Sequence, residues 1–346
     1  LLDNLTYSPL LFETAEELRD LGELAAAALL YEGVALSERS QHSERLALCQ
    51  YRLFTLRLGE DQAKNLEAAI HFEPYVERLD EMEQLDALRD LANAYRSLRK
   101  WDKVANIAHI MGKKANIMYE LLHNTELRIK EEPVRTQKPL FYYRAFADLL
   151  MSNVSAEKKD YQQALHYTHL YEDLSWVNET DSETLHWKGR FFGWAEVNKY
   201  VIGLLAGDQS VLPSYVDYIF TNEGEVLPGI LNMIQAANNS GLNINNYLEK
   251  FQNALEEIIN NNKHKGVYTQ QYIDERLTKV LYEFAYYFLN YEVYSKGFDY
   301  LLKSLEKSLI INNEQSILNC MRLFERFRQV ASCKVSRDYH ILVTKE

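Results

Sequence analysis

The stretch from Leu88 to Met111 constrains the fold of this chain more than any other part of its 346 residues. Leu91 and Tyr95 lie at helical spacing before a short charged turn, and Val104 and Ala108 resume the apolar stripe after it. This pattern predicts two amphipathic helices folded back on each other. Such a hairpin cannot bury its own apolar face, so neighbouring hairpins must stack against it.

The predicted hairpin has the features of the tetratricopeptide repeat, a helix–turn–helix unit of about 34 residues. We expect its turn at residues 99–102, closed by the aromatic side chain of Trp101. The pattern returns further along the chain, where Tyr161 and Ala164 take the places of Trp101 and Val104. Stacked hairpins of this type form a superhelix with a concave binding surface.

Further helices are expected along the rest of the chain. We predict them over residues 9–36 (one hairpin), 43–58, 61–79, 185–206, 211–220, 230–238, 247–259, 281–288 and 294–304, with a cap over about 313–346 that contains a helix at 316–330. The helix after Trp101 is expected to continue to Arg128 and to end before Pro133. Residues 260–266 are expected to form a polar loop. We assign no structure to the tail after Ser332. The sequence therefore predicts an all-α fold, a right-handed superhelical solenoid of tetratricopeptide-like hairpins in a single domain over residues 1–346.

The composition fits this fold and excludes several classes of function. Hydrophobic residues make up 47% of the chain, enough for a large core, while 13 Gly and 6 Pro are too few for a sheet-rich protein. The formal net charge of -12 leaves no basic surface for phosphates, so we do not expect this segment to bind nucleic acid directly. The three cysteines lack metal-like spacing, and no apolar run reaches the roughly 20 residues of a membrane helix. We also expect no signal peptide. We expect a cytoplasmic protein that does not act on membranes.

The sequence offers no constellation that argues for catalysis. Phosphate-binding glycine loops, a nucleophile elbow and a Cys-x-x-Cys motif are all absent. His166 and His169 are three residues apart and could place two nitrogens near a metal, but no third ligand is evident and a solvated pair is the better interpretation. We therefore expect no enzyme activity, no cofactor and no metal.

The candidate binding residues lie on the first helix of each hairpin, which lines the concave face of a tetratricopeptide solenoid. Asn93 and Asn153 follow the small residue of two such helices, a position that points into the groove. An asparagine side chain both donates and accepts, so it can bridge the N–H and C=O of an extended peptide. The other candidates for peptide binding are Arg96, Arg190, Asn198, Asn232, Gln235, Tyr286 and Asn290. The alternative is that asparagine belongs to the ordinary repeat consensus in a chain that is rich in it.

Together, the divergent repeats, the asparagines on first helices and the acidic balance resemble a known family. They are similar to the cytoplasmic peptide-sensing tetratricopeptide regulators of Gram-positive bacteria (RRNPP-type quorum-sensing receptors), most of all to those with an N-terminal helix-turn-helix DNA-binding domain. The resemblance implies that Asn93 and Asn153 match the family's backbone-clamping asparagines. It also implies a homodimer whose superhelix pitch changes with peptide. This sequence departs from the family pattern by lacking a DNA-binding region, and since it starts Leu-Leu rather than Met, we expect a missing upstream output domain.

Three functions remain open at this point. The chain could be a receptor for a short secreted signalling peptide that controls transcription, which is the function we predict. It could instead be a related receptor that acts on a response-regulator protein, or a tetratricopeptide scaffold that docks one protein partner in its groove.

Overall fold

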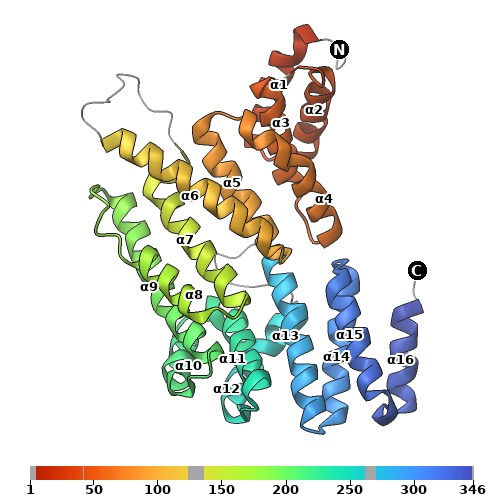
Figure 1. The fold of residues 1–346 in the computed structure, drawn as a ribbon. Helices are drawn as coiled ribbons and strands as arrows, with labels where there is room; N and C mark the ends of the chain where they lie inside the picture. Colours follow the sequence, from red (N-terminus) through yellow and green to blue (C-terminus); the bar gives the residue numbers. More distant parts are fainter. Residues whose placement is uncertain (1–4, 42, 124–135, 262–269, 345–346) are drawn as a thin grey trace. The chain divides into compact units, whose positions relative to one another are not determined.

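The computed structural model describes residues 5–41, 43–123, 136–261 and 270–344. Within these ranges the chain forms sixteen α-helices and five short 3-10 helices, with no β-strand (Figure 1). Helices that are neighbours in the sequence pack against each other, as α1 does with α2 and α13 with α14. The all-α prediction is confirmed, and the packing order is compatible with an α solenoid. The right-handed superhelix stays a prediction.

The helices have the following bounds: α1 Ser8–Asp20, α2 Leu24–Ser37, α3 Glu44–Arg57, α4 Gln62–Phe72, α5 Glu81–Ser97, α6 Trp101–His123, α7 Leu140–Glu157, α8 Tyr161–Glu172, α9 Ser182–Leu205, α10 Leu212–Thr221, α11 Val226–Ser240, α12 Asn245–Asn261, α13 Gln270–Asn290, α14 Tyr294–Ile310, α15 Glu314–Phe327 and α16 Cys333–Thr344. The 3-10 helices are Leu5–Tyr7, Glu73–Arg78, Gln209–Val211, Glu223–Glu225 and Arg328–Val330.

The chain divides into two compact units, and each is described by itself. Unit 1 contains α1 to α3, α5 to α7, the larger parts of α4 and α8, and α9 as far as Phe192. Unit 2 contains α9 from Gly193 onward and α10 to α16, and the segments Gly59–Ala63 and Lys159–Leu165 are grouped with it. The single domain over residues 1–346 stays a prediction.

A single type of turn joins the helices of several hairpins. The residue two positions before the second helix has a left-handed backbone, with φ values of 82° at Gly22, 55° at Arg99, 62° at Glu292 and 51° at Asn312. The residue that follows donates its N–H to a carbonyl five residues back, as Lys100 does to Tyr95 at 2.9 Å. This is the pattern of a Schellman cap, which satisfies the last carbonyls of the first helix. The same turn recurs in both units, which supports the prediction of repeated hairpins.

The turn after α5 is one place where the sequence prediction needs correction. We expected it at residues 99–102, but α6 already begins at Trp101. The left-handed Arg99 reverses the chain early, and the carbonyl of Lys100 accepts the first helical hydrogen bond, from the N–H of Val104 at 3.0 Å. Trp101 is therefore the first residue of the second helix and not part of the turn.

Three other segments differ from the prediction or go beyond it. The helix expected over residues 61–79 ends at Phe72 and continues as a 3-10 helix, because Pro74 lacks an N–H for the α-helical ladder. The tail that the sequence left unassigned forms α16, whose Tyr339 ring stacks on Phe324 with centroids 3.7 Å apart. The expected extension to Arg128, the stop at Pro133 and most of the loop at 260–266 lie outside the described residues, but α12 continues to Asn261.

Small residues mark the places where paired helices approach closely, as the repeat pattern predicts. Ala15 and Ala27 are fully buried in the first hairpin. A Cβ atom added at Gly297 on α14 would lie 2.7 Å from the Cγ atom of Leu289 on α13, so only glycine fits without movement of that neighbour. Among the described residues no helix is long and apolar enough to cross a membrane.

Candidate functional site

A strip of polar residues on α5 is the starting point of the candidate site. Asp86, Arg89, Asn93 and Arg96 follow each other at intervals of three or four residues, which places them on one side of the helix. The intervening residues, such as Leu88 and Leu91, are buried in the core. The apolar side of α5 is therefore fixed by packing, and the polar strip is held on the other side.

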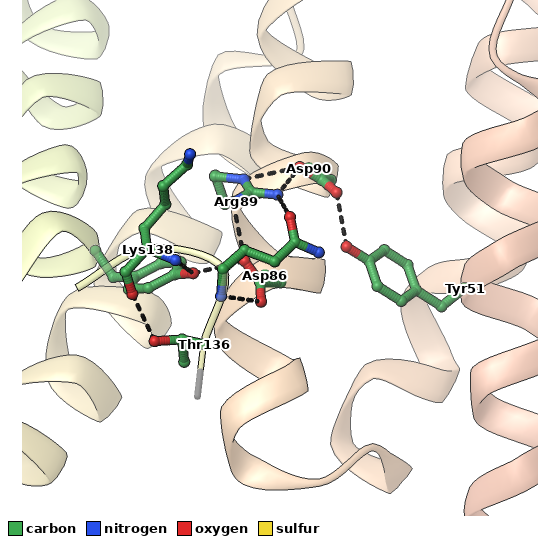
Figure 2. Close-up of polar contacts among 8 residues, drawn as sticks. Tyr51, Asp86, Arg89, Asp90, Thr136 and Lys138 are labelled. Atoms are coloured by element: carbon green, nitrogen blue, oxygen red, sulfur yellow. Dashed lines mark hydrogen bonds and ion pairs between the residues drawn. The ribbon is translucent and has the colours of Figure 1, made fainter. Parts of the chain in front are cut away.

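An ion network anchors the beginning of this strip, as Figure 2 shows. The Arg89 guanidinium donates through Nε to Asp90 Oδ1 at 2.9 Å, through Nη1 to Asp86 Oδ1 at 2.9 Å and through Nη2 to Gln137 Oε1 at 3.1 Å. Only 11% of the Arg89 side chain is exposed. Burial acts to lower the pKa of Arg89, but the carboxylates of Asp90 and Asp86 outweigh it and raise that pKa above its usual value.

The same network joins α5 to α3 and to the start of α7 (Figure 2). The Tyr143 hydroxyl on α7 donates to Asp86 Oδ1 at 2.5 Å, and the Gln137 N–H donates to Asp86 Oδ2 at 3.1 Å. On the other side, the Tyr51 hydroxyl on α3 donates to Asp90 Oδ2 at 2.7 Å. Burial and the neighbouring carboxylates raise the pKa values of both phenols, which keeps them protonated as donors. Three helices are thus held in register by one set of charged hydrogen bonds.

This network positions its neighbours, and it has little capacity left to bind a ligand. Two carboxylates face one guanidinium, so Arg89 is neutralised within the fold and would not attract an anion. All three nitrogens of the Arg89 guanidinium donate hydrogen bonds to side-chain oxygens of the protein. The residue that follows one turn later on the strip, Asn93, is in a different situation.

The side-chain amides of Asn93 on α5 and Asn153 on α7 are half-buried and make no hydrogen bond with the described part of the chain. Each amide therefore has one acceptor and two donor hydrogens that water or a ligand can use. These are the two residues that the sequence pattern singled out, and they lie on successive first helices of unit 1.

Aromatic residues share the side of α7 that carries Asn153. Tyr142 precedes Asn153 by eleven residues, about three helical turns, so the two lie on the same side of the helix. The Tyr142 ring meets Trp187 of α9 edge to face at 4.7 Å, and Lys138 Nζ lies 4.8 Å from the Trp187 centroid. The charges of Arg89 and Arg96 on α5 act on the Tyr142 phenol, which places these arginines near it.

We call this surface the first-helix face of unit 1, and define it by Arg89, Asn93, Arg96, Tyr142, Asn153 and Trp187. Its helices α5, α7 and α9 are the first helices of successive hairpins. It combines the amides of Asn93 and Asn153, the cationic side chain of Arg96, and the rings of Tyr142 and Trp187. Arg190, also predicted, is half-buried on α9 one turn after Trp187.

The predicted residues of unit 2 are engaged inside the protein. Asn232 on α11 donates to the Tyr215 hydroxyl at 2.9 Å, and Gln235 donates to Glu283 Oε1 at 3.1 Å. On α13, Asn290 donates to the Tyr286 carbonyl at 2.9 Å. Arg326 of α15 donates to Asn290 Oδ1 at 3.3 Å and lies over the Tyr286 ring at 5.7 Å. Asn198 is half-buried on α9. The side chains of Asn232 and Gln235 thus bond to α10 and α13, and Asn290 bonds to its own helix and to α15.

Sequence reasoning missed several residues of the first-helix face. The charged group Asp86, Arg89 and Asp90 carried a signal, because an aspartate three residues before an arginine can pair with it on a helix. The aromatic spacing around Trp187 indicates a core residue, whereas its ring is partly exposed and lies between Tyr142 and Lys138. The contact of Gln137 with Asp86 spans 51 residues and leaves no local trace in the sequence.

The two histidines lie at the surface of α8, and the structure describes one carboxylate contact for them. His169 Nδ1 lies 3.2 Å from Glu172 Oε2, and both His166 and His169 are exposed. Among the described residues, no group of three or more His, Cys, Asp or Glu side chains could hold a metal ion.

No protein-family model matches this chain, and no curated protein matches it in sequence. The resemblance to tetratricopeptide peptide receptors therefore stays a prediction, and the function is inferred from the first-helix face.

Proposed function

We propose that this chain is a receptor for a short linear peptide, and that the first-helix face of unit 1 binds the peptide main chain. The observation that carries the proposal is the pair of amides at Asn93 and Asn153, which lie on successive first helices without hydrogen-bond partners among the described residues. An amide in this state can accept from a peptide N–H and donate to the next C=O, as in other modes of main-chain recognition.

The surroundings of the two amides favour a peptide over a simple anion. Arg89 is neutralised by Asp86 and Asp90, so the charge beside Asn93 is modest. Arg96 lies one turn further on along α5 and is half-buried, as Asn93 is. The partly exposed Trp187 ring, which packs against the buried Tyr142, offers apolar area to peptide side chains. The ion network keeps α5 and α7 in fixed register. A pre-organised surface loses less entropy when it binds a flexible peptide.

We further propose that the bound peptide controls transcription, through a DNA-binding domain that lies outside residues 1–346, and that the receptor is a cytoplasmic homodimer. Two points support this output. The sequence resembles the Gram-positive peptide receptors with a helix-turn-helix domain, and the net charge of -12 makes this segment itself a poor ligand for DNA.

The peptide proposal is tested by affinity selection followed by calorimetry. The purified chain is incubated with a randomised heptapeptide library, and the enriched peptides are identified by mass spectrometry. The best peptide is then titrated into the wild-type chain and into Asn93→Ala and Asn153→Ala. Each variant should bind about 5- to 150-fold more weakly, because peptide groups lose a partner worth roughly 1–3 kcal/mol.

Asn106→Ala is the matched control, since Asn106 is an exposed asparagine on α6, a second helix of the same unit. Its affinity should equal that of the wild type. The proposal is wrong if the Asn93 and Asn153 variants also keep wild-type affinity, or if no peptide is enriched. In the latter case a scaffold for a folded protein partner becomes the better explanation.

A further inference from the structure

A pocket of about 820 Å³ lies within unit 1, between α6, α7 and the C-terminal part of α8. Its volume is in the range of roughly 300–1,000 Å³ that is typical of small-molecule sites. Ala147, Met151 and Leu170 supply apolar lining, and Trp176 adds an aromatic ring. The pocket therefore has the size and the mixed lining of a ligand site.

The pocket is distinct from the first-helix face. Arg144 of α7 lines it, and Asn153 of the first-helix face follows Arg144 by nine residues. Nine residues are about two and a half helical turns, so the two side chains leave α7 on opposite sides. A ligand in the pocket would not occupy the surface that we assign to the peptide.

Arg144 is held in place by two neighbours in the pocket wall. Its Nη1 donates to Asn116 Oδ1 at 2.7 Å, and its guanidinium lies 4.1 Å from the centroid of the Trp176 ring. Asn116 in turn donates to Glu120 Oε1 at 2.7 Å. The guanidinium thus has a hydrogen-bond acceptor and a stacking surface of its own.

Asp148, one turn after Arg144, lines the same pocket without such support. Its carboxylate is half-buried and accepts no hydrogen bond from the described residues. Burial raises the pKa of Asp148 to about 6, and the charge of Arg144 offsets this only in part. A carboxylate that is removed from water and lacks a donor is costly in its ionised form. It is suited to a ligand that brings a cationic donor.

We propose that this pocket binds a small primary amine, with the ammonium group donating to the carboxylate of Asp148 and the apolar body lying against Met151 and Leu170. The ammonium supplies the donor that the protein does not, and a pocket of about 820 Å³ has the size of a small-molecule site and not of a site for a folded partner. Charge-assisted hydrogen bonds of this kind are among the strongest available.

Other charged groups around the pocket set the pH dependence. The groups that line it are His109 and Lys113 on α6, Arg144 and Asp148 on α7, and His166, His169, Glu172 and Asp173 on or just after α8. Acidification protonates Asp148, and the loss of its negative charge opposes binding of a cation. We therefore expect amine affinity to fall by about tenfold between pH 7.5 and pH 5, while an alkylamine itself stays protonated.

The test uses three probes with one apolar body and different heads, namely pentylamine, pentanol and pentanoate. Saturation-transfer NMR titrations measure their dissociation constants with the wild-type chain, Asp148→Asn and Asp102→Asn at pH 7.5. Pentylamine should bind most tightly to the wild type and should lose at least about tenfold affinity in Asp148→Asn. Asp102→Asn, which changes an exposed carboxylate on α6 outside the pocket, should stay within about twofold of the wild type.

Three results would overturn the proposal. Tighter binding of pentanoate than of pentylamine would mean that Lys113 and Arg144 make this an anion site. Equal binding of pentanol and pentylamine would mean that only the apolar lining matters. Unchanged pentylamine affinity in Asp148→Asn, with circular dichroism showing a folded variant, would mean that the carboxylate is not the contact. The wild-type probe series gives the first two answers without any variant.

Discussion

The two units use the side-chain amides of their first helices in different ways. In unit 1, Asn93 and Asn153 make no hydrogen bonds with the described chain. In unit 2, Asn232 and Gln235 donate to a tyrosine hydroxyl and a carboxylate of neighbouring helices. The residue types are the same, and the difference lies in what the adjacent helix offers. An amide on a first helix is open to a ligand only where its neighbour supplies no partner.

The carboxylates of the two units show a related contrast. Glu283 of unit 2 accepts from Gln235 and, at 2.8 Å, from Asn238, so its oxygens are used by neutral amides. In unit 1, Asp86 and Asp90 neutralise Arg89, while Asp148 is half-buried without a hydrogen-bond donor among the described residues. Unit 1 therefore contains both a paired ion network and a carboxylate, that of Asp148, without a hydrogen-bond donor in the described part of the chain. The following predictions test these differences between the units.

The largest effect is expected from Arg89→Ala in unit 1. Removing the guanidinium leaves the buried carboxylate of Asp86 and the half-buried carboxylate of Asp90 without their cation, which should lower the free energy of unfolding by about 3–5 kcal/mol. Urea denaturation followed by circular dichroism measures this loss. Arg57→Ala is the control, because Arg57 pairs with Glu32 at the surface and should cost at most about 1 kcal/mol. Equal losses in the two variants would show that the network is not the anchor of unit 1.

The second effect is a gain in stability from Asp148→Asn at high pH. The folded-state pKa of Asp148, about 6, lies above its usual value of 3.8, so folding favours the protonated form. The stability that this contributes is fully present below the unfolded pKa and is lost as the pH rises through about 6. The uncharged variant should therefore be more stable than the wild type at about pH 8, on the order of 2–3 kcal/mol.

Urea melts of Asp148→Asn and wild type at several pH values test this prediction. The gap between them should shrink by about 2 kcal/mol from pH 8 to pH 4.5. Glu283→Gln in unit 2 should show no such gain, because the Glu283 carboxylate already has donors. A pH-independent gap would mean that Asp148 is not the group that titrates.

The third effect concerns the internal amides of unit 2. Asn232→Ala removes the donor to the buried Tyr215 hydroxyl and should lower the free energy of unfolding by about 1–3 kcal/mol. Thermal melts and urea titrations of the variant measure the loss. Asn239→Ala, an exposed asparagine on the same helix, is the control and should change stability by less than about 0.5 kcal/mol.

The smallest effect is expected from the open amides of unit 1. Asn93→Ala and Asn153→Ala remove no hydrogen bond within the described chain, so each should change the free energy of unfolding by less than about 0.5 kcal/mol. The comparison with Asn232→Ala is made in the same urea titration. If all three variants lose stability equally, the asparagines brace the fold in both units, and the contrast on which our proposed function depends disappears.

Much of the fold follows from local patterns in the sequence. Helical periodicity alone identified most of the helices. The helix α16 was missed although Val335 and Tyr339 are spaced four residues apart, because the segment is short and largely polar. Its stabilising contact, Tyr339 on Phe324, joins two helices and is not visible in either alone.

The candidate site was less accessible to sequence reasoning for a physical reason. A repeat pattern gives the side of a helix on which a residue lies, and Asn93, Asn153 and Asn232 all satisfied it. Whether the amide is free depends on the side chain that faces it from another helix, such as Tyr215 opposite Asn232, seventeen residues away. Local sequence thus predicts positions of polar groups, and their availability is a property of the assembled fold.

The phenol–carboxylate contacts of unit 1 have an optical consequence. The hydroxyls of Tyr51 and Tyr143 donate to Asp90 and Asp86, so ionising either ring would place a phenolate against a carboxylate. Burial and these carboxylates raise the pKa of both phenols, so neither ring should absorb as tyrosinate until the helices separate. In a rapid jump to strongly alkaline pH, part of the tyrosinate absorption should therefore rise slowly. Buried tyrosines of unit 2 such as Tyr215 should contribute to this slow rise as well, and the loss of amplitude in Tyr51→Phe and Tyr143→Phe would identify the part that follows the opening of α3, α5 and α7.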